Sequence, residues 1–504
     1  MKAESIMSLS HLNRRAALAA LGAVATGVAG FGHAADPLNA WRSSYAAHNG
    51  VLKTPLNSGS LPIEGRWPSA LQGTLFRVGP ARRELGGVSM NHWFDGDGML
   101  QAFRFEQGRI SHHGMMLATP KLKAEEAAGR LLYSGFATTL PNSPPLAGPD
   151  TLNPANINLL SLPARGELFA LWEAGSALAV DPLTLEAKGF KVWSPDTKGA
   201  PFSAHPRVAP DGTVWSFGYM PGSGRLVIYE ISPAGQLRRH HMMAAPQADM
   251  VHDFAITDSH LVFLLMPLKF SGEVASGNLL SHYQWQDKSP LIVLLVDKAD
   301  FKIHRFEVPA TGVFHLANAW EQGGTVQVRF VAQPDILGSM QQMQIDKPRT
   351  GGISRKTQWT QVTLNPASGK AQMQMQTTGV TDVEFPRIHP ARNGLATQFT
   401  TLLARSTSMN PQVNGFDSVL TLNGEQHKRH RYGDGWIAEE HVYVPRSHAA
   451  PEGQGWLVGT AYHWPSERTA LSVFDASAVD AGPLARVTLP YGLPLGFHGQ
   501  FVAA

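Results

Sequence analysis

The chain has 504 residues, of which 43% are hydrophobic and 16% are charged, so it contains ample material for a packed core. Its formal charge is +3, from 42 basic and 39 acidic residues, and no run of like charge stands out. A nucleic-acid partner is therefore not expected. There is no cysteine, which excludes disulfides, thiolate metal sites, iron–sulfur clusters and a cysteine nucleophile. Any metal must bind to histidine and carboxylate side chains.

Residues 1–35 are expected to be an export signal rather than part of the fold. The adjacent Arg14 and Arg15 precede an uncharged run of small residues that extends to Gly32. This pair favours the twin-arginine route, although Ala17 stands where that signal usually has a bulky apolar residue. A membrane anchor is the alternative, but the run is shorter and less apolar than the roughly 20 residues that a spanning helix needs. We expect a periplasmic protein, soluble or peripherally associated with the membrane.

The rest of the chain, residues 36–504, is expected to form one all-β domain. Clusters of Pro, Gly, Asp and Asn favour tight turns, and Lys121–Leu132 is the best of the few stretches with a helical period. Many strand–turn–strand units without an evident linker favour a β-propeller, and a pair of β-sandwich or jelly-roll domains is the alternative. The segments typical of strands are rich in β-branched and aromatic residues: Thr213–Tyr219, Arg225–Ile231, Leu261–Met266, Leu291–Val296, Thr325–Val331 and Trp456–Tyr462.

Four of the 21 histidines stand in apolar or small-residue surroundings: His205 in FSAHPRV, His252 in MVHDFAI, His315 in VFHLANAWE and His498 in GFHGQFV. The first three are about 47 and 63 residues apart, close to one propeller blade, and the last follows after about three blade lengths. One metal ligand per blade, directed at a shared axis, would explain this spacing. A set of separate structural histidines is the alternative that spacing leaves open. Histidines beside Arg or Lys are interpreted as solvated: His240, His241, His427 and His430.

Seven ordered motifs run from Phe76 to the C-terminus: FRVGP at Phe76–Pro80, HWFDGDGML at His92–Leu100, SAHP at Ser203–Pro206, VHDFAIT at Val251–Thr257, HLANAWE at His315–Glu321, EFPRIHP at Glu384–Pro390 and GFHG at Gly496–Gly499. Together they resemble the carotenoid cleavage oxygenase family. The resemblance implies a seven-bladed β-propeller with loops and short helices capping one face. It also implies one non-haem iron(II) ion on the central axis, and it carries the ligand roles to His205, His252, His315 and His498.

The same resemblance implies glutamates that accept hydrogen bonds from the ligand histidines. The matching positions are Glu173 in LWEAG, Glu384 in VEFP and Glu440 in EEHVYVP. The last is chosen over Glu439 by its offset from Pro445. An acceptor behind a ligating imidazole fixes its orientation and raises its donor strength. Without the resemblance, each of these glutamates would be interpreted as facing solvent.

The reaction implied by the resemblance is cleavage of a C=C double bond by O2 to give two carbonyl products. Four neutral imidazoles leave iron its full charge and open positions for dioxygen, and no general base is obvious in the motifs. The protein's part is to bind the metal, exclude water and hold one double bond near it. An apolar conjugated substrate, a carotenoid or apocarotenoid, suits a chain with 23 Phe, 16 Met and 12 Trp. No protein partner is indicated.

Lys121, in the segment Met115–Gly129, indicates hydroxystilbenes as the second candidate substrate class. In the stilbene-cleaving branch of the family a lysine near this point binds the substrate's phenol, and a nearby ammonium favours the phenolate. The alternative is a solvated side chain that opens a helix beside Lys123, Glu125 and Glu126. The tyrosine that should accompany the lysine cannot be assigned from the sequence.

The segment Leu131–Gly148 is apolar and rich in Pro. It is interpreted either as a packed loop between blades or as a loop at the tunnel mouth that touches membrane lipid to collect substrate. Two other functions are disfavoured. A non-catalytic ligand-binding propeller would be expected to lose at least one of the histidines or glutamates, and the retinoid isomerase activity of the visual cycle does not suit an exported chain.

Overall fold

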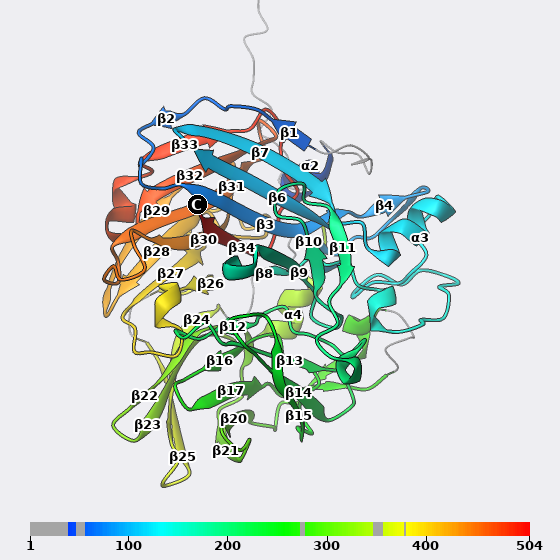
Figure 1. Ribbon diagram of the computed structural model, residues 1–504, viewed down its shortest axis with the longest axis vertical. Coiled ribbons are helices and arrows are strands. Elements are labelled where there is room, and N and C mark those ends of the chain that lie inside the picture. Colours follow the sequence, from blue (N-terminus) through cyan, green and yellow to red (C-terminus); the bar gives the residue numbers. More distant parts are fainter. Residues whose placement is uncertain (1–38, 47–55, 273–277, 346–355, 377–379) are drawn as a thin grey trace, which may run out of the picture. The chain divides into compact units, whose positions relative to one another are not determined.

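The structure is a computed structural model that describes residues 39–46, 56–272, 278–345, 356–376 and 380–504. In the described chain, seven sheets of four or five strands surround a common centre and form a seven-bladed β-propeller (Figure 1). The propeller predicted from the sequence is confirmed, and the alternative of two sandwich domains is wrong. The predicted export signal, residues 1–35, lies outside the described residues.

In five blades the strands are arranged in chain order outward from the centre, and none comes from a distant part of the chain. They are β8 (Asn158–Leu162), β9 (Glu167–Leu171), β10 (Leu178–Val180) and β11 (Ala187–Phe190); β12 (Arg207–Val208), β13 (Val214–Tyr219), β14 (Arg225–Ile231) and β15 (Leu237–Ala244); β16 (Phe254–Ile256), β17 (His260–Leu265), β20 (Leu291–Asp297) and β21 (Ile303–Val308); β22 (Gly312–Gln322), β23 (Thr325–Gln333), β24 (Gln358–Asn365) and β25 (Lys370–Met375); and β26 (Val383–Arg387), β27 (Phe399–Ala404), β28 (Ser418–Asn423) and β29 (Gln426–Arg431).

The other two blades combine strands from distant parts of the chain, and they close the ring. One contains β34 (Gly499–Ala503), β3 (Gly73–Arg82), β6 (Asp97–Glu106), β7 (Arg109–Met116) and β1 (Leu56–Ser58); the other contains β30 (Trp436–Pro445), β31 (Gly455–His463), β32 (Arg468–Asp475), β33 (Ala485–Thr488) and β2 (Glu64–Gly65). The C-terminal β34 pairs antiparallel with β3, from Gly73 opposite Ala503 to Arg77 opposite Gly499. Hydrogen bonds therefore join the last strand of the chain to one of the first.

All six segments predicted as strands are strands: β13, β14, β17, β20, β23 and β31. The residues of β20 are buried on both faces up to Val296, because each blade packs against a neighbour on either side. Phe217, Phe254 and Phe263 are fully buried in one such layer, which joins the blade of β13 to that of β17. Burying a side chain of this size contributes about 1.5–3 kcal/mol, so these layers hold the ring together.

The α-helices in the described part of the chain are few, and short 3-10 turns accompany them: α2 (Asn39–Ala46), α3 (Pro120–Ala128) and α4 (Ile336–Gln341). Helix α3 begins after Thr119, whose side chain accepts a hydrogen bond from the Leu122 N–H. It ends at Ala128, because Gly129 turns the chain with a φ of 66°. The predicted helix Lys121–Leu132 was therefore too long.

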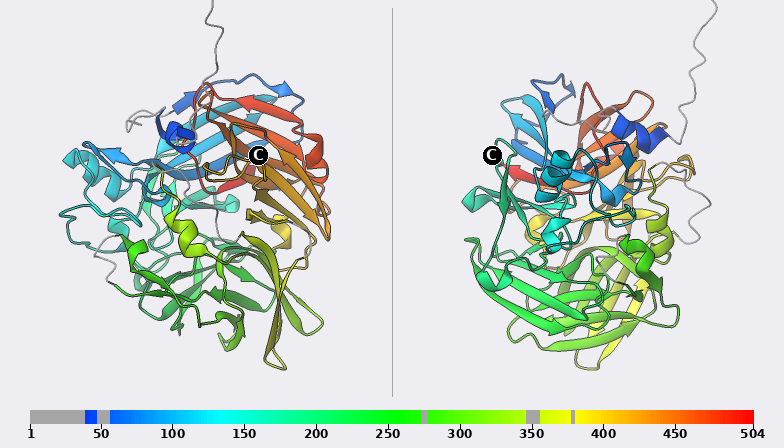
Figure 2. Two further views of the ribbon diagram at one scale, coloured as in Figure 1. Left: turned by 180° about the vertical axis from the view of Figure 1, so that it is seen from behind. Right: turned by 90° about the vertical axis from the view of Figure 1, so that its right-hand side faces the viewer.

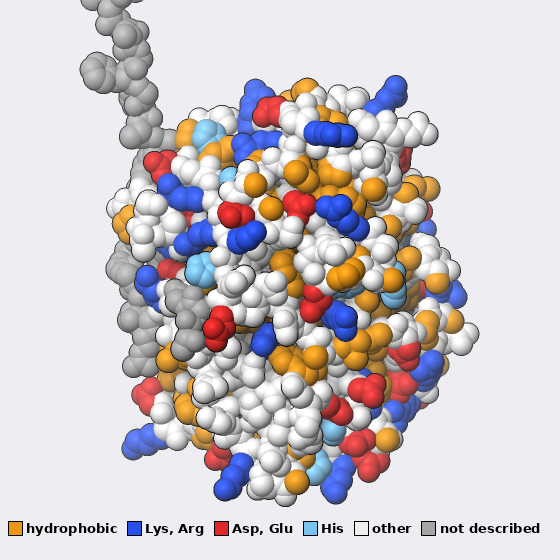
Figure 3. Space-filling model, turned by 90° about the vertical axis from the view of Figure 1, so that its left-hand side faces the viewer, with side chains coloured by type: hydrophobic (Ala, Val, Ile, Leu, Met, Phe, Trp, Pro, Cys, Tyr) orange, Lys and Arg blue, Asp and Glu red, His pale blue; other side chains and the backbone are white. Residues whose placement is uncertain are grey.

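Helices α2 and α4 lie on the face of the sheets that is turned away from the viewer in Figure 1 and toward the viewer in the left panel of Figure 2. None of the helices in the described ranges has the length and apolar character that crossing a bilayer requires. On the face shown in Figure 3, basic and acidic side chains are interspersed with hydrophobic ones. This face carries no single-sign patch of the kind that binds a phosphate backbone. Two short ribbons complete the described strands: β4 (Glu84–Leu85) with β5 (Val88–Ser89), and β18 (Leu268–Phe270) with β19 (Tyr283–Trp285).

Candidate metal centre

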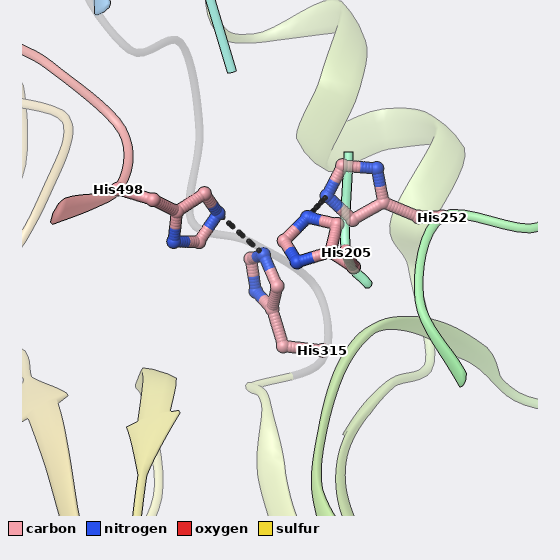
Figure 4. A group of neighbouring side chains, drawn as sticks. All are labelled: His205, His252, His315 and His498. Carbon is pink, nitrogen blue, oxygen red and sulfur yellow. Dashed lines mark hydrogen bonds between the residues drawn. The ribbon is translucent and has the colours of Figure 1, made fainter. Parts of the chain in front are cut away.

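The four histidines selected from the sequence lie at the inner strands of the ring. His205 and His252 stand two residues before β12 and β16, His315 lies within β22, and His498 directly precedes β34. Because inner strands surround the centre, side chains at their upstream ends converge, and Figure 4 shows the four imidazole rings facing one another. One nitrogen atom of each ring lies within 4.8 Å of the corresponding atoms of the others.

The rings meet as two pairs. The Nε2 atoms of His205 and His252 are 3.0 Å apart, and those of His315 and His498 are 3.1 Å apart. In the second pair both Nδ1 atoms face carboxylates, Glu384 for His315 and Glu440 for His498. Neutral rings that donate through Nδ1 present lone pairs at Nε2, so this contact needs a positive charge between the rings, either a proton or a metal ion.

The spacing of the nitrogens fits a metal ion. Two nitrogens that each lie about 2.1 Å from one ion are about 3.0 Å apart at a right angle and about 3.4 Å apart at a tetrahedral angle. The contacts of 3.0 and 3.1 Å match the right angle. The four nitrogens together lie within 4.8 Å of one another, and four histidines do not fill the coordination shell of an octahedral ion. Positions therefore stay free, as an ion that activates a small molecule requires.

Burial changes the pKa values of the imidazoles in the cluster. It lowers the pKa of His205 well below its ordinary value and that of His498 to about 4, so both rings are neutral, as metal ligands must be. Burial acts in the same sense on His315, but Glu384 outweighs it and raises the pKa of that ring. Glu384 therefore shifts His315 toward its protonated form, with which a metal ion competes for the ring nitrogen.

Each of the three glutamates selected from the sequence faces a different histidine. Glu173 Oε2 lies 2.6 Å from His252 Nδ1, and Glu384 Oε2 lies 2.6 Å from His315 Nδ1. Glu440 Oε1 lies 2.9 Å from His498 Nδ1, so Glu440 rather than Glu439 occupies this place. Within the described residues, no hydrogen bond joins His205 to a carboxylate. The backbone N–H of His205 donates to the Ser203 hydroxyl oxygen at 3.0 Å.

A family model described as "Retinal pigment epithelial membrane protein" matches residues 53–503. The chain belongs to this family, the carotenoid cleavage oxygenases. It is 29% identical to the apocarotenoid-15,15'-oxygenase of Synechocystis sp., over 87% of this chain and 92% of that one. It is 28% identical to lignostilbene-alpha,beta-dioxygenase isozyme III of Sphingomonas paucimobilis, over 88% and 94%. A structure of cobalt-substituted Synechocystis apocarotenoid oxygenase matches with a TM-score of 0.78 and 26% identity, covering 93% of this chain and 99% of that one.

In this carotenoid cleavage oxygenase, each glutamate has a further partner that sequence reasoning missed. The Tyr219 hydroxyl donates to Glu173, and the Gln333 amide donates to Glu384. Arg387 donates from Nε and Nη2 to the two oxygens of Glu440, both at 2.8 Å. Burial alone raises the pKa of Glu440, but Arg387 and His498 hold it well below its ordinary value. Only Arg387 had a sequence signal, since it lies in the EFPRIHP motif.

A cavity of about 450 Å³ leads to the histidines of this oxygenase. His252, His315 and His498 form part of its wall, and Phe314 and Phe385 pack against the imidazoles with ring centroids about 5.2–5.3 Å apart. Its volume lies in the range of small-molecule sites, which are about 300–1,000 Å³. The wall is largely aromatic and aliphatic, and includes Trp93, Phe94, Phe136, Leu146, Met250 and Phe497. It therefore suits an apolar ligand.

The segment Leu131–Gly148 forms part of the same wall, through side chains that include Tyr133, Phe136 and Leu146. Asp95 holds this segment: it accepts hydrogen bonds from the Ala137 N–H and the Thr138 hydroxyl. Packing against the fold agrees with the first interpretation of this segment. Contact with membrane lipid stays a prediction.

The structure corrects one interpretation of Lys121. Its side chain is only 4% exposed, so the solvated alternative is wrong. The Nζ atom lies 2.8 Å from Asp97 Oδ1 and 3.0 Å from Glu125 Oε2, and these carboxylates outweigh burial and raise the pKa of the lysine. Sequence reasoning missed this because Asp97 approaches from β6, and Arg82 from β3 shares both carboxylates. Lys121 is thus a charged group in the wall of the cavity.

Proposed function

We propose that this chain is a non-haem iron(II) dioxygenase that cleaves one C=C double bond of a long, apolar conjugated substrate of the apocarotenoid or carotenoid class. The reaction adds the two oxygen atoms of O2 to the two carbons of the bond and gives two carbonyl products, without an external reductant. Membership in the family supports the reaction class. The observation that carries the proposal is the four-histidine cluster beside an apolar cavity, whose wall includes three of these histidines.

His205, His252, His315 and His498 would hold the iron through Nε2. When bound, iron(II) supplies the open coordination positions and the redox chemistry that dioxygen needs. The glutamates fix three of the rings with their lone pairs toward the centre. Phe314 and Phe385 beside the rings exclude water.

The cavity supplies binding and orientation rather than acid–base chemistry. An extended apolar chain gains about 25 cal/mol for each Å² of its surface that the wall removes from water. Holding the substrate at a fixed depth would select which double bond lies next to the histidines, since positioning alone can account for several kcal/mol of a barrier. An apocarotenoid, whose length exceeds its width, suits this arrangement.

The test is to replace each of the four histidines by Ala and to measure iron per chain and product formation. We expect about one iron per wild-type chain and loss of both iron and activity in every variant. The matched control is His112→Ala: His112 is also buried, but bonds to Gln101 and Tyr491 in another part of the protein. Full iron content and activity in His252→Ala or His498→Ala would contradict the proposal.

A second candidate substrate class, the hydroxystilbenes, is favoured by Lys121. A buried ammonium in the cavity wall can donate a hydrogen bond to a phenol oxygen and favour the phenolate. The phenolate's electrons make the double bond more reactive toward oxygen. A relative named lignostilbene dioxygenase is 28% identical to this chain. The two carboxylates that already pair with Lys121 reduce this attraction, so apocarotenoids remain our first choice.

The two classes are separated by assaying Lys121→Met on both, with mass spectrometry of the products. If hydroxystilbenes are the substrate, their cleavage should fall by about 10-fold or more, because one charge-assisted hydrogen bond is lost. Arg82→Met is the matched control, since it removes the other cation that pairs with Asp97 and Glu125 but does not line the cavity. Cleavage of apocarotenoids alone, unchanged in Lys121→Met, would exclude the stilbene function.

A further inference from the structure

Next to two of the histidines in the sequence lie Arg207 and Asp253, which form an ion pair with side chains 15% and 2% exposed. The site described above gives neither residue a role. Arg207 follows His205 by two residues, and Asp253 follows His252 directly. Arg207 Nη2 donates to Asp253 Oδ1 at 2.8 Å and Oδ2 at 2.6 Å, and Arg207 Nε donates to the Phe254 carbonyl at 2.7 Å. The carboxylate also accepts the Phe254 N–H at 2.7 Å. The pair therefore joins the segments that carry two of the four histidines.

The same pair reaches the segment of a third histidine. Arg207 Nη2 donates to the Leu316 carbonyl at 2.8 Å, and the Leu316 N–H donates to Asp253 Oδ2 at 2.8 Å. Leu316 follows His315 in β22, and the pairing of β22 with β23 shifts register on both sides of Leu316. Such bulges free backbone groups from the ladder and redirect side chains. Here both backbone groups of Leu316 bond to the ion pair, which ties the orientation of His315 to the other two segments.

We propose that Arg207 and Asp253 form a positioning pair that sets the mutual spacing of His205, His252 and His315 before the metal binds. This inference rests on the proposed function, because it takes these histidines as iron ligands. A guanidinium has its donors in a rigid plane, and a carboxylate accepts along fixed directions, so the pair holds three backbone segments at fixed separations. A site organised in advance binds its metal more tightly, since less order is lost on binding.

The fourth histidine depends on a separate ion pair. Arg387 Nη2 donates to the Gly499 carbonyl, and the Gly499 N–H donates to Glu440 Oε2, both at 2.8 Å. Gly499 directly follows His498. Disrupting Arg207 or Asp253 should therefore shift three histidines relative to His498, and change the arrangement of ligands rather than remove one.

The experiment measures metal binding by Asp253→Asn and by Arg207→Lys. Asp253→Asn replaces an acceptor oxygen by an N–H donor, which then faces the donors that the carboxylate served. Arg207→Lys keeps the positive charge, but one ammonium group cannot reach Asp253 and the carbonyls of Phe254 and Leu316 at once. Metal-free full-length protein is titrated without oxygen with Fe(II), and with Co(II) in competition with a coloured chelator. The absorption spectrum of the Co(II) form reports the arrangement of its ligands. We expect affinities about 10- to 100-fold weaker than wild type and an altered Co(II) spectrum.

The matched control is Asp417→Asn. Asp417 is also almost fully buried and pairs with an arginine, Arg431, but its other partners, Ser406 and Ser418, adjoin none of the four histidines. It should lower the melting temperature without changing metal affinity. Wild-type affinity and an unchanged Co(II) spectrum in Arg207→Lys, or an equal loss of affinity in Asp417→Asn, would overturn the inference.

The same titration separates this inference from the proposed function. If wild-type protein binds no metal, or if His252→Ala binds it as tightly as wild type, the four histidines are not the metal site and the proposed function fails. If His252→Ala abolishes binding while Asp253→Asn and Arg207→Lys bind as wild type does, only the positioning role fails.

Discussion

At the scale of single residues, the three glutamates differ in the charge of the second hydrogen-bond donor that each one binds. Glu173 and Glu384 accept from a phenol and an amide, which are neutral, whereas Glu440 accepts from the Arg387 guanidinium. A carboxylate with a neutral partner keeps its full charge toward the imidazole, so His252 and His315 should be stronger donors than His498. Two uncompensated carboxylates would also balance the charge of a divalent ion in a buried site.

This difference predicts unequal effects of Glu→Gln substitutions on folding. Glu440→Gln leaves Arg387 without its charged partner, which costs about 3–5 kcal/mol for a fully buried pair and less here, because Arg387 keeps some access to solvent. Glu173→Gln and Glu384→Gln should cost about 1–3 kcal/mol each. All three should lower iron retention by about 10- to 100-fold. Thermal unfolding of the metal-free protein and iron content after dialysis against a chelator measure the two effects.

Glu321→Gln is the control for these variants, since Glu321 pairs with His260 outside the cluster, at 2.9 Å from Nδ1. It should leave iron retention unchanged. Wild-type iron content in all three cluster variants would mean that these carboxylates do not support the metal. Equal losses of stability in all three would contradict the role given to Arg387.

The sequence predicted the residues of the cluster that lie in short motifs, but not their partners from other blades. His205 and His252 stood out because mainly apolar or small neighbours around a histidine are visible within one short segment. Tyr219 and Gln333 were missed because each reaches its glutamate from a different strand, 46 and 51 residues away in the chain. Such contacts depend on strand register and on bulges such as those of β22, and neither can be predicted from local composition.

At the scale of elements, the strand positions followed from composition, whereas the pairing of the ends did not. Buried strands such as β20 are continuous runs of β-branched and aliphatic residues, and these can be recognised in any sequence. β34 carries no signal that it pairs with β3, which lies more than 400 residues earlier in the chain. Its position matters for function, because His498 directly precedes it.

Deleting residues 499–504 should therefore destabilise the ring and the metal centre together. The deletion removes the five residue pairs between β34 and β3, at about 1 kcal/mol for each hydrogen bond lost. It also removes Gly499, whose backbone groups bond to Arg387 and Glu440. We expect a lower melting temperature and little retained iron, measured by calorimetry and by metal analysis. Deletion of Ala504 alone is the control. If the variant without residues 499–504 kept wild-type stability and iron content, the ring would close without β34.

At the scale of the whole molecule, the closure of the ring bears on when the chain can fold relative to its predicted export. Pairing of β34 with β3, and of β2 with β33, needs both ends of the propeller, so the fold is complete only after the last strand has been made. The twin-arginine route carries folded proteins, which suits such a chain.

We therefore predict that residues up to about Ala34 are removed on export and that the mature protein is periplasmic. The basis is the pair Arg14 and Arg15 ahead of an uncharged run of small residues. Changing both arginines to Lys should leave the protein in the cytoplasm, folded and holding iron, because only the export signal is altered. Cell fractionation, the mass of the purified protein and its iron content are the measurements. Periplasmic protein with an intact N-terminus would indicate an uncleaved anchor, and normal export of the double Lys variant would exclude the twin-arginine route.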